Sequence, residues 1–267
     1  MPTISPQAAI DPSASIADDV EIGPFCVVGP QVTLGPGCKL LNNVTLIGHT
    51  TVGSNNTFYP NCVVGAPPQD KKYRGGLTRL EIGDNNDIRE AVTIHTGTEK
   101  GGWVTRVGSH NLLMVNCHVG HDAQIGNGCV IANNVMIAGH IHIGNGAWIS
   151  GGVGIHHYVT IGDHAYLGGY SRIHHDVPPF MKVDGSDKIR GINAEGLKRA
   201  GYAADDIEAL ETACRKLFAK KEKPLALVLA DYNTNNGLNP HVKRVIDFLH
   251  RRNQGKHGRY LESLRAK

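Results

Sequence analysis

The chain has 267 residues and a formal net charge of +3, and only 19% of its residues are charged. This balance argues against a general nucleic-acid binder, and no apolar run is long enough to form a transmembrane segment. The first nineteen residues, MPTISPQAAIDPSASIADD, lack the basic start and apolar core of a signal peptide, so we expect a soluble cytoplasmic protein.

An aliphatic residue or Phe recurs at every sixth position in three blocks, which begin at Ile4, Ile82 and Val107 and together hold twenty-six such positions. A helix would scatter a six-residue spacing around its surface, whereas short strands joined by corners would bring these side chains to one interior. Glycine, with 33 residues, often follows the aliphatic residue and suits tight corners. The pattern predicts a parallel β-helix of about nine eighteen-residue coils, stacked at roughly 4.8 Å over about 40 Å.

A small residue occupies the position four residues after each aliphatic one, and five of the six cysteines fall there. They are Cys26, Cys38, Cys62, Cys117 and Cys129. We expect them to fill the interior as small apolar groups. A disulfide framework is the alternative, which the even scatter of cysteines in a cytoplasmic chain disfavours.

Two polar, glycine-containing segments interrupt the repeat, at residues 65–79 and 95–106. Each must bulge from a regular prism as a loop, either as a tolerated insertion or as the wall of a substrate cleft. The first segment favours the cleft, because it concentrates four polar residues, Gln69, Asp70, Lys71 and Lys72.

The six-residue phase stops near residue 180, so we expect a β-helix over residues 1–180 and a helical domain over residues 181–267. Two sets of apolar residues there follow helical spacing: Ile207, Leu210, Cys214, Leu217 and Phe218, and then Val242, Val245, Ile246 and Leu249. Asn239-Pro240 is suited to cap the second helix and open its first turn.

The tail is also the cationic part of the chain, with 15 Lys and Arg against 9 Asp and Glu from residue 192 onward. Its basic clusters are Arg215, Lys216, Lys220, Lys221 and Lys223, and Lys243, Arg244, Arg251 and Arg252. They form either a solvated face or a surface for an acidic partner.

Residues eighteen apart should lie above one another, and three such columns collect polar side chains along one edge. They read His121, Gly139, His157 and His175; Gly120, Ala138, His156 and His174; and Asp122, His140, Tyr158 and Asp176. A purely structural interpretation has to treat this alignment as chance.

The edge suits general-base chemistry, because the pKa of histidine lies near operating pH. In this interpretation His121 takes a proton from an attacking hydroxyl and Asp122 stabilises the imidazolium. Gly139 presents its backbone N–H to a developing oxyanion, and His118, His140 and His156 orient the substrate. These requirements match acyl transfer from a thioester to a sugar hydroxyl.

Zinc is the rival hypothesis, because His-x-x-His in CHVGHD stands among further histidines. The γ-class carbonic anhydrases use a His-x4-His pair, and no two histidines here are five apart. We therefore expect no metal.

The hexads resemble those of the left-handed β-helix acyltransferase superfamily. Four motifs, CHVGHD (117–122), NNVMIAGH (133–140), QDKKY (69–73) and NAEGLKRAG (193–201), resemble the UDP-N-acetylglucosamine O-acyltransferases of lipid A synthesis, in the same order. The resemblance covers the whole chain. It implies an all-β parallel left-handed β-helix with a small C-terminal α-helical domain, assembled as a homotrimer with a cleft between subunits.

The resemblance also implies an activity, in which a (3R)-3-hydroxyacyl group passes from acyl carrier protein to the 3-hydroxyl of UDP-N-acetylglucosamine. No cofactor is implied beyond the carrier thioester, and the acidic carrier would suit the cationic tail.

Site residues carry over position by position. His121 matches the family's general base and Gly139 its oxyanion donor. The residues that match positions around the sugar and acyl chain are Asp70, Lys72, His95, His118, His140 and His156. Asn193, Glu195 and Arg199 match the nucleotide-binding segment, with Arg199 as the diphosphate partner. Gly169 matches a position that gauges acyl length, and glycine there leaves room for longer chains.

Two departures from the family affect the expected nucleotide contacts. His157 stands where the family often has Gln, and Ala200 where a second basic residue is frequent. Neutral drift within one activity and a changed substrate both remain open.

Three alternatives remain. One is transfer to a 3-amino sugar nucleotide. Another is a non-catalytic β-helix binding protein, which would favour flat ladders of one residue type. The third is the N-acyltransferase of the same pathway, which carries an extra N-terminal uridine-binding domain, whereas here the repeat begins at Ile4.

Overall fold

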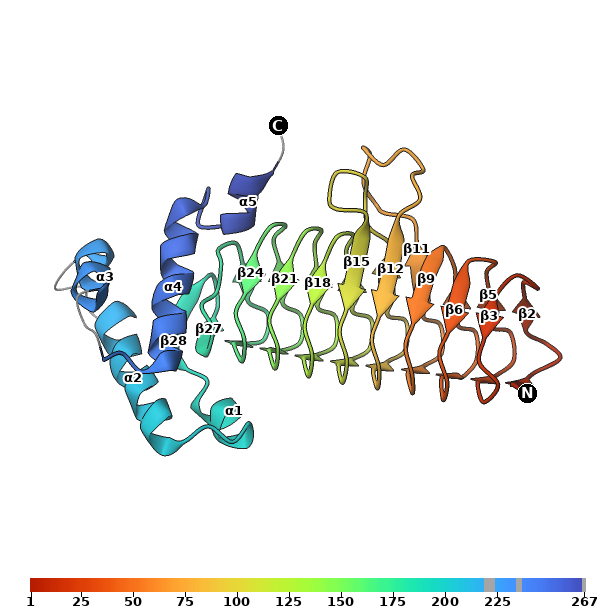
Figure 1. Ribbon diagram of the computed structural model, residues 1–267, viewed down its shortest axis with the longest axis horizontal. Helices are drawn as coiled ribbons and strands as arrows, with labels where there is room; N and C mark the ends of the chain where they lie inside the picture. Colours follow the sequence, from red (N-terminus) through yellow and green to blue (C-terminus); the bar gives the residue numbers. More distant parts are fainter. Residues whose placement is uncertain (219–223, 234–236, 266–267) are drawn as a thin grey trace.

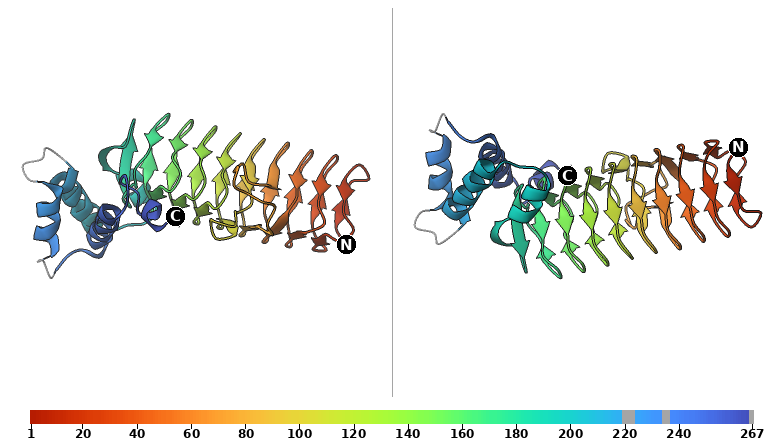
Figure 2. Two further views of the ribbon diagram at one scale, coloured as in Figure 1. Left: turned by 90° about the horizontal axis from the view of Figure 1, so that it is seen from above. Right: turned by 90° about the horizontal axis from the view of Figure 1, so that it is seen from below.

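The computed structural model of the protein describes residues 1–218, 224–233 and 237–265. A long three-sided prism of short strands runs from the N-terminus, and the helices gather at its other end (Figures 1 and 2). Each side of the prism is one sheet, and the three are named A, B and C.

Sheet A contains β1 (Thr3–Ile4), β4 (Glu21–Ile22), β7 (Lys39–Leu40), β10 (Thr57–Phe58), β13 (Asp87–Ile88), β16 (Leu112–Leu113), β19 (Val130–Ile131), β22 (Trp148–Ile149), β25 (Tyr166–Leu167), β27 (Met181–Asp184) and β28 (Lys188–Ile192). Sheet B contains β2 (Ala9–Ile10), β5 (Val27–Val28), β8 (Thr45–Leu46), β11 (Val63–Ala66), β14 (Thr93–His95), β17 (His118–Val119), β20 (Met136–Ile137), β23 (Gly154–Ile155) and β26 (Arg172–Ile173). Sheet C contains β3 (Ser15–Ile16), β6 (Val32–Leu34), β9 (His49–Val52), β12 (Arg79–Ile82), β15 (Val104–Val107), β18 (Gln124–Ile125), β21 (His142–Ile143) and β24 (Thr160–Ile161).

Neighbouring coils pair in parallel, and from β1 to β26, away from the two loops, the paired residues are eighteen apart. In sheet B, for example, His118 pairs with Met136 and Met136 pairs with Gly154. Each strand from β1 to β26 holds one of the twenty-six hexad positions. The predicted parallel β-helix with a C-terminal helical region is therefore confirmed.

The hexad aliphatics form the core of the prism. From the second coil onward they are almost entirely buried, and Leu46, Ile94, Ile131 and Leu167 have no exposed surface. The five cysteines of the small-residue slot are also buried, at 0–1% exposure. All six cysteines are free thiols, so they pack rather than cross-link.

The two interruptions form loops over residues 67–78 and 96–103, which lie within the segments that the sequence singled out. Both project from the same edge of the prism (Figure 1). They are tied together, because Glu99 Oε1 accepts hydrogen bonds from the backbone N–H of Gly76 at 2.8 Å and of Arg74 at 3.2 Å. The Thr78 and Thr96 hydroxyls add a contact of 3.0 Å.

The repeat passes into the helical region through two strands. Parallel pairing joins β27 to β25, and β28 then turns back antiparallel to β27. The helices that follow are α1 (Ala194–Arg199), α2 (Ala204–Phe218), α3 (Leu225–Asn233), α4 (Pro240–Gln254) and α5 (Tyr260–Leu264). The division into two domains at residue 180 stays a prediction.

A second hydrophobic core holds these helices on the end of the prism. Ile207, Leu210, Cys214 and Leu217 from α2 are buried in it, as are Val242, Val245, Ile246 and Leu249 from α4. Asn239 caps α4 as predicted, because its side-chain oxygen accepts from the N–H of His241 at 2.9 Å. No helix among the described residues is both long and apolar enough to cross a membrane.

The C-terminal segment returns to the prism beside α4. Tyr260 donates its N–H to Asp176 Oδ2 at 2.7 Å, and the Arg259 guanidinium donates to the His174 carbonyl at 2.8 Å. These contacts fix α5 over the last coils, on the edge from which the two loops also project (Figure 1).

The burial pattern predicts how a core truncation acts. Leu34→Ala removes a side chain that is 2% exposed and should lower the free energy of unfolding by about 2–5 kcal/mol. Denaturant unfolding at fixed protein concentration measures the change. Thr33→Ala in the same strand, β6, removes an outward-facing side chain and should change stability by less than about 1 kcal/mol. Equal losses would contradict the inward orientation of the hexad position.

Candidate active site

The predicted polar edge lies at the corner where the chain passes from sheet B to sheet C. Asp122, His140 and Tyr158 occupy this corner in three successive coils, each with a left-handed backbone (φ 63°, 60° and 64°). The N–H of His140 donates to the His121 carbonyl at 2.9 Å, so the corners stack directly. The sequence columns therefore exist as a physical ridge.

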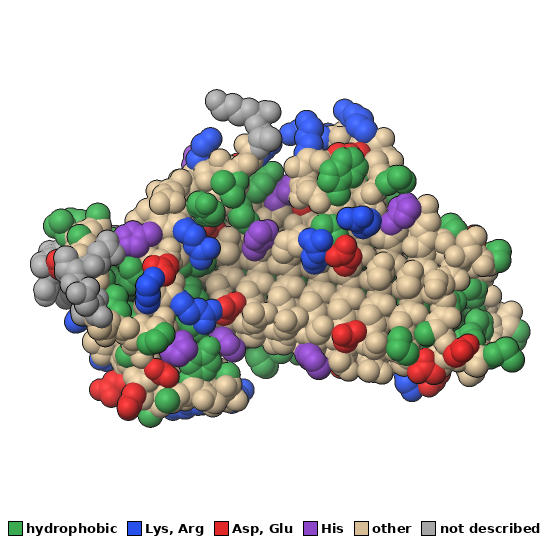
Figure 3. Space-filling view, in the orientation of Figure 1, with side chains coloured by type: hydrophobic (Ala, Val, Ile, Leu, Met, Phe, Trp, Pro, Cys, Tyr) green, Lys and Arg blue, Asp and Glu red, His purple; other side chains and the backbone are tan. Residues whose placement is uncertain are grey.

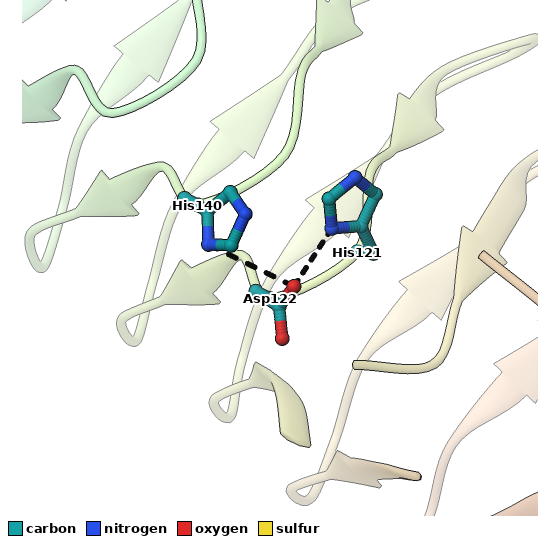
Figure 4. A group of neighbouring side chains, drawn as sticks. All are labelled: His121, Asp122 and His140. Carbon is teal, nitrogen blue, oxygen red and sulfur yellow. Dashed lines mark hydrogen bonds and ion pairs between the residues drawn. The ribbon is translucent and has the colours of Figure 1, made fainter. Parts of the chain in front are cut away.

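His121 and Asp122 form a hydrogen-bonded pair on this ridge. The distance from His121 Nδ1 to Asp122 Oδ2 is 2.7 Å (Figure 4). The Asp122 side chain is 1% exposed and that of His121 is 16% exposed. Because a carboxylate can only accept, Nδ1 of His121 carries the proton, which leaves the lone pair on Nε2 available as a base.

Gly139 lies against the imidazole of His121 from the next coil. A Cβ at residue 139 would stand 2.6 Å from His121 Cε1 and 2.7 Å from Nε2, so only glycine fits. The N–H groups of Ala138 and His140 donate to carbonyls in the prism. Among the described residues the Gly139 N–H has no acceptor, which leaves it free to stabilise an anion beside the base.

His140 extends the ridge. Its Nδ1 lies 3.7 Å from Asp122 Oδ2, and its ring stacks on Tyr158 with centroids 4.5 Å apart. The Arg265 guanidinium lies 5.6 Å from the Tyr158 ring, so α5 borders the ridge. Burial lowers the pKa of His140, and the Asp122 and Asp70 carboxylates oppose that shift.

His95 and His118, from neighbouring coils of sheet B, form a second imidazole pair near His121. Their rings meet edge to face with centroids 4.9 Å apart, and His118 Nδ1 lies 2.8 Å from the Thr93 hydroxyl. Burial lowers the pKa of His95 to about 4 and also lowers the pKa of His118. Both rings are therefore neutral near pH 7. The Nδ1 of His95 is buried and has no hydrogen-bond partner among the described residues.

His156 and His157 lie further along the same ridge. Their ring centroids are 3.9 Å apart, and His156 Nδ1 donates to the His157 carbonyl at 3.1 Å. Burial lowers the pKa of His157, with a further contribution from His156. His174 and His175, which the columns also singled out, both bind Asp187 at 3.2 Å.

Asp70 and Lys72 belong to the first loop, over residues 67–78. The Lys72 N–H donates to Asp70 Oδ1 at 2.9 Å, which holds the two in one turn. The loop joins β11 of sheet B to β12 of sheet C, so it leaves the prism at the same corner that carries the ridge.

The remaining predicted residues lie away from the ridge. Gly169 is at the corner between sheets A and B, where a Cβ would meet nothing closer than 3.6 Å. Asn193 caps α1 and donates its side-chain amide to the His164 carbonyl at the corner between sheets C and A. Glu195 pairs with Lys198 at 3.3 Å, and Arg199 is exposed. One chain does not bring these residues to His121.

A groove of about 870 Å³ lies between sheet C and α4. Figure 3 looks onto this sheet, with Lys and Arg side chains around its helical end. Gln124, His142, Arg244 and Arg251 line the groove, and His121 and Gly139 do not. This groove and the cluster of His121, Asp122 and Gly139 are thus in different places.

Residues 105–175 and 176–258 match the models of two known families. Residues 105–139 and 140–175 match the model of bacterial transferase hexapeptide repeats, and residues 176–258 match domain 2 of UDP-N-acetylglucosamine O-acyltransferase.

The chain is also similar to solved structures of UDP-N-acetylglucosamine acyltransferases. The Acinetobacter baumannii LpxA structure is 41% identical, with 91% of this chain and 95% of that one covered and a TM-score of 0.86. The UDP-N-acetylglucosamine O-acyltransferase of Moraxella catarrhalis is 42% identical, with coverage of 91% and 95% and a TM-score of 0.87. The corresponding Bacteroides fragilis enzyme is 37% identical, with coverage of 93% and 97% and a TM-score of 0.88. The chain belongs to the UDP-N-acetylglucosamine acyltransferase family.

This acyltransferase has a residue at the ridge that sequence reasoning missed. Thr98 donates its hydroxyl to Asp122 Oδ2 at 2.7 Å and its N–H to Asp122 Oδ1 at 2.8 Å. It sits in the second loop, outside the six-residue phase. No column could have placed it beside Asp122.

His121, Asp122 and His140 also offer three ligand atoms within 4.8 Å of one another, the one such cluster of His, Cys, Asp and Glu among the described residues. Asp122 Oδ2 already accepts from His121 Nδ1 and the Thr98 hydroxyl. A cation would have to displace one of these donors. The geometry therefore suits a hydrogen-bonded acid–base group better than a metal centre.

The low pKa of His95 predicts a pH-dependent stability. Because the folded pKa is about 4 against 6.5 for a free imidazole, the unfolded state binds more protons between these values. Stability contributed by the neutral ring is present above about pH 6.5 and is lost as the pH falls toward about 4. The free energy of unfolding, measured with urea at several pH values across this range, should change less with pH for His95→Asn than for the wild type. An unchanged slope would contradict the buried, neutral imidazole.

Proposed function

We propose that the protein transfers a (3R)-3-hydroxyacyl group from acyl carrier protein to the 3-hydroxyl of UDP-N-acetylglucosamine, the first step of lipid A biosynthesis. The observation that carries this proposal is the contact of His121 with both Asp122 and Gly139 on one ridge. Family membership supports the sugar nucleotide, because the named relatives are UDP-N-acetylglucosamine acyltransferases.

The geometry supports a direct transfer. His121 Nε2 takes the proton of the sugar hydroxyl as its oxygen attacks the thioester carbonyl. The negative charge that develops on the carbonyl oxygen is stabilised by the Gly139 N–H, and Asp122 stabilises the imidazolium. When the tetrahedral intermediate collapses, the carbon–sulfur bond breaks and the imidazolium returns its proton to the leaving thiolate.

The imidazoles along this edge suit substrate contacts. We assign His95, His118, His140 and His156, with Asp70 and Lys72 of the first loop, to the sugar and the acyl chain. A neutral imidazole can donate one hydrogen bond and accept another, which matches the hydroxyl and amide groups of an N-acetylated sugar.

Assembly of several copies would complete the site. Residues proposed for the base, the acyl-length position and the nucleotide segment lie on three different edges of one prism. A cyclic trimer places different edges of neighbouring copies against each other. Asn193, Glu195 and Arg199 of one copy would then face His121 of another, with the Arg199 guanidinium on the diphosphate.

The cationic tail is proposed to receive the acidic acyl carrier protein. Part of its charge is used internally, because Lys243 pairs with Asp247 at 2.6 Å and Arg244 pairs with Asp163. Arg215, Lys216 and Arg251 remain exposed for a partner. Lys220, Lys221 and Lys223 lie outside the described residues.

Removal of the base tests the proposed function. His121→Ala should lower the rate of acyl transfer from acyl carrier protein to UDP-N-acetylglucosamine by roughly 10²–10⁴-fold, with the fold unchanged. Mass spectrometry of the product reports transfer and the acyl length. If the variant folds and keeps full activity, another residue must be the base, or the protein has a binding role in place of a catalytic one. If the protein forms only an amide product, from a 3-amino sugar nucleotide, the 3-hydroxyl of UDP-N-acetylglucosamine is not the acceptor.

Gly139→Ala tests the oxyanion position. The added methyl would overlap the His121 ring, so kcat should fall by at least roughly tenfold. Gly154→Ala, in β23 of the next coil, is a matched control, because its Cβ would stand 3.7 Å from Met136. If both variants transfer at the wild-type rate, the oxyanion assignment fails.

A further inference from the structure

The second loop, over residues 96–103, holds the carboxylate of Asp122 from two directions. The Thr98 N–H donates to Oδ1 at 2.8 Å and the Thr98 hydroxyl donates to Oδ2 at 2.7 Å. Asp122 is also fixed through its main chain, because its N–H donates to the Thr105 hydroxyl at 2.8 Å. All three residues are buried, at 2%, 2% and 0% exposure.

Gly101 closes the loop over the same carboxylate. A Cβ at residue 101 would stand 2.0 Å from Asp122 Cγ and 2.2–2.3 Å from its two oxygens. The loop folds back on Thr98, whose carbonyl accepts from the N–H of Trp103 at 2.9 Å and of Gly101 at 3.2 Å. The carboxylate is thus enclosed as well as hydrogen-bonded.

Enclosure matters because Asp122 Oδ2 has two imidazoles within reach. Nδ1 of His121 is 2.7 Å away and Nδ1 of His140 is 3.7 Å away. A carboxylate free to rotate about its side-chain bonds could pair with either ring. With both oxygens bound by Thr98, the carboxylate is held in the orientation that favours His121.

We infer that Thr98 is a positioning residue, which fixes the Asp122 carboxylate and through it the tautomer and orientation of the His121 ring. The inference rests on the proposed function, because it requires His121 to act as the base. It assigns the second loop a role in catalysis that does not require contact with substrate.

Thr98→Val tests the inference, because it replaces the hydroxyl with a methyl group and keeps the backbone N–H. We expect kcat to fall by roughly tenfold, while KM for UDP-N-acetylglucosamine stays within about twofold, because only the positioning of the base changes. Thr98→Ser restores the hydroxyl and should recover wild-type kcat to within about twofold.

Thr96→Val is the matched control. It removes a buried hydroxyl of the same loop, whose partner is Thr78 rather than Asp122, so kcat should not change. Gly101→Ala provides a second route, because it displaces the carboxylate sterically and should lower kcat as Thr98→Val does. Thermal unfolding of each variant separates this effect from loss of the fold.

A double-mutant cycle decides whether Thr98 acts through Asp122. In an Asp122→Asn background, adding Thr98→Val should change kcat by less than about twofold. Wild-type kcat in Thr98→Val, no rescue by Ser, or an equal loss in the Asp122→Asn background would each overturn the inference. Failure of the proposed function is distinguishable, because it would show as a fully active His121→Ala enzyme.

Discussion

The hydrogen-bonded register between successive coils determines where the side chains of the ridge lie. Main-chain donors of one coil bind carbonyls of the next, so residues eighteen apart are held at one rung spacing. His121 of one coil and Gly139 of the next therefore lie in contact without any dedicated interaction between them. Main-chain hydrogen bonds between coils thus set the positions of the ridge residues, and the side chains determine only the chemistry of the ridge.

The two loops leave this register intact. Val63 pairs with Thr93, thirty residues on, so the first loop adds twelve residues to a coil of eighteen. Asp87 pairs with Leu112, twenty-five residues on, so the second adds seven. Because strand pairing resumes with the same side chains inward, both insertions are accommodated without disturbing the core, and the second brings Thr98 to Asp122.

The six-residue repeat in the sequence predicted the features that follow the regular stacking of the coils. The hexads gave the three sheets, the buried cysteines and the contact of His121 with Gly139 and Asp122. The contact of Thr98 with Asp122 could not be predicted, because an insertion has no fixed phase in the repeat. Its contacts follow only from the folded loop. The position of Gly169 at another corner follows from the same phase, whereas Asn193 lies beyond residue 180, where the phase stops.

The buried thiols have a consequence for chemical durability. Burial raises the pKa of Cys62, Cys117 and Cys129 to about 11. Near neutral pH the thiolate fraction of each is roughly one in ten thousand, and only the thiolate reacts readily with oxidants or electrophiles. A chain with six cysteines should therefore tolerate peroxide and alkylating agents as if it had almost none, for as long as its coils stay closed.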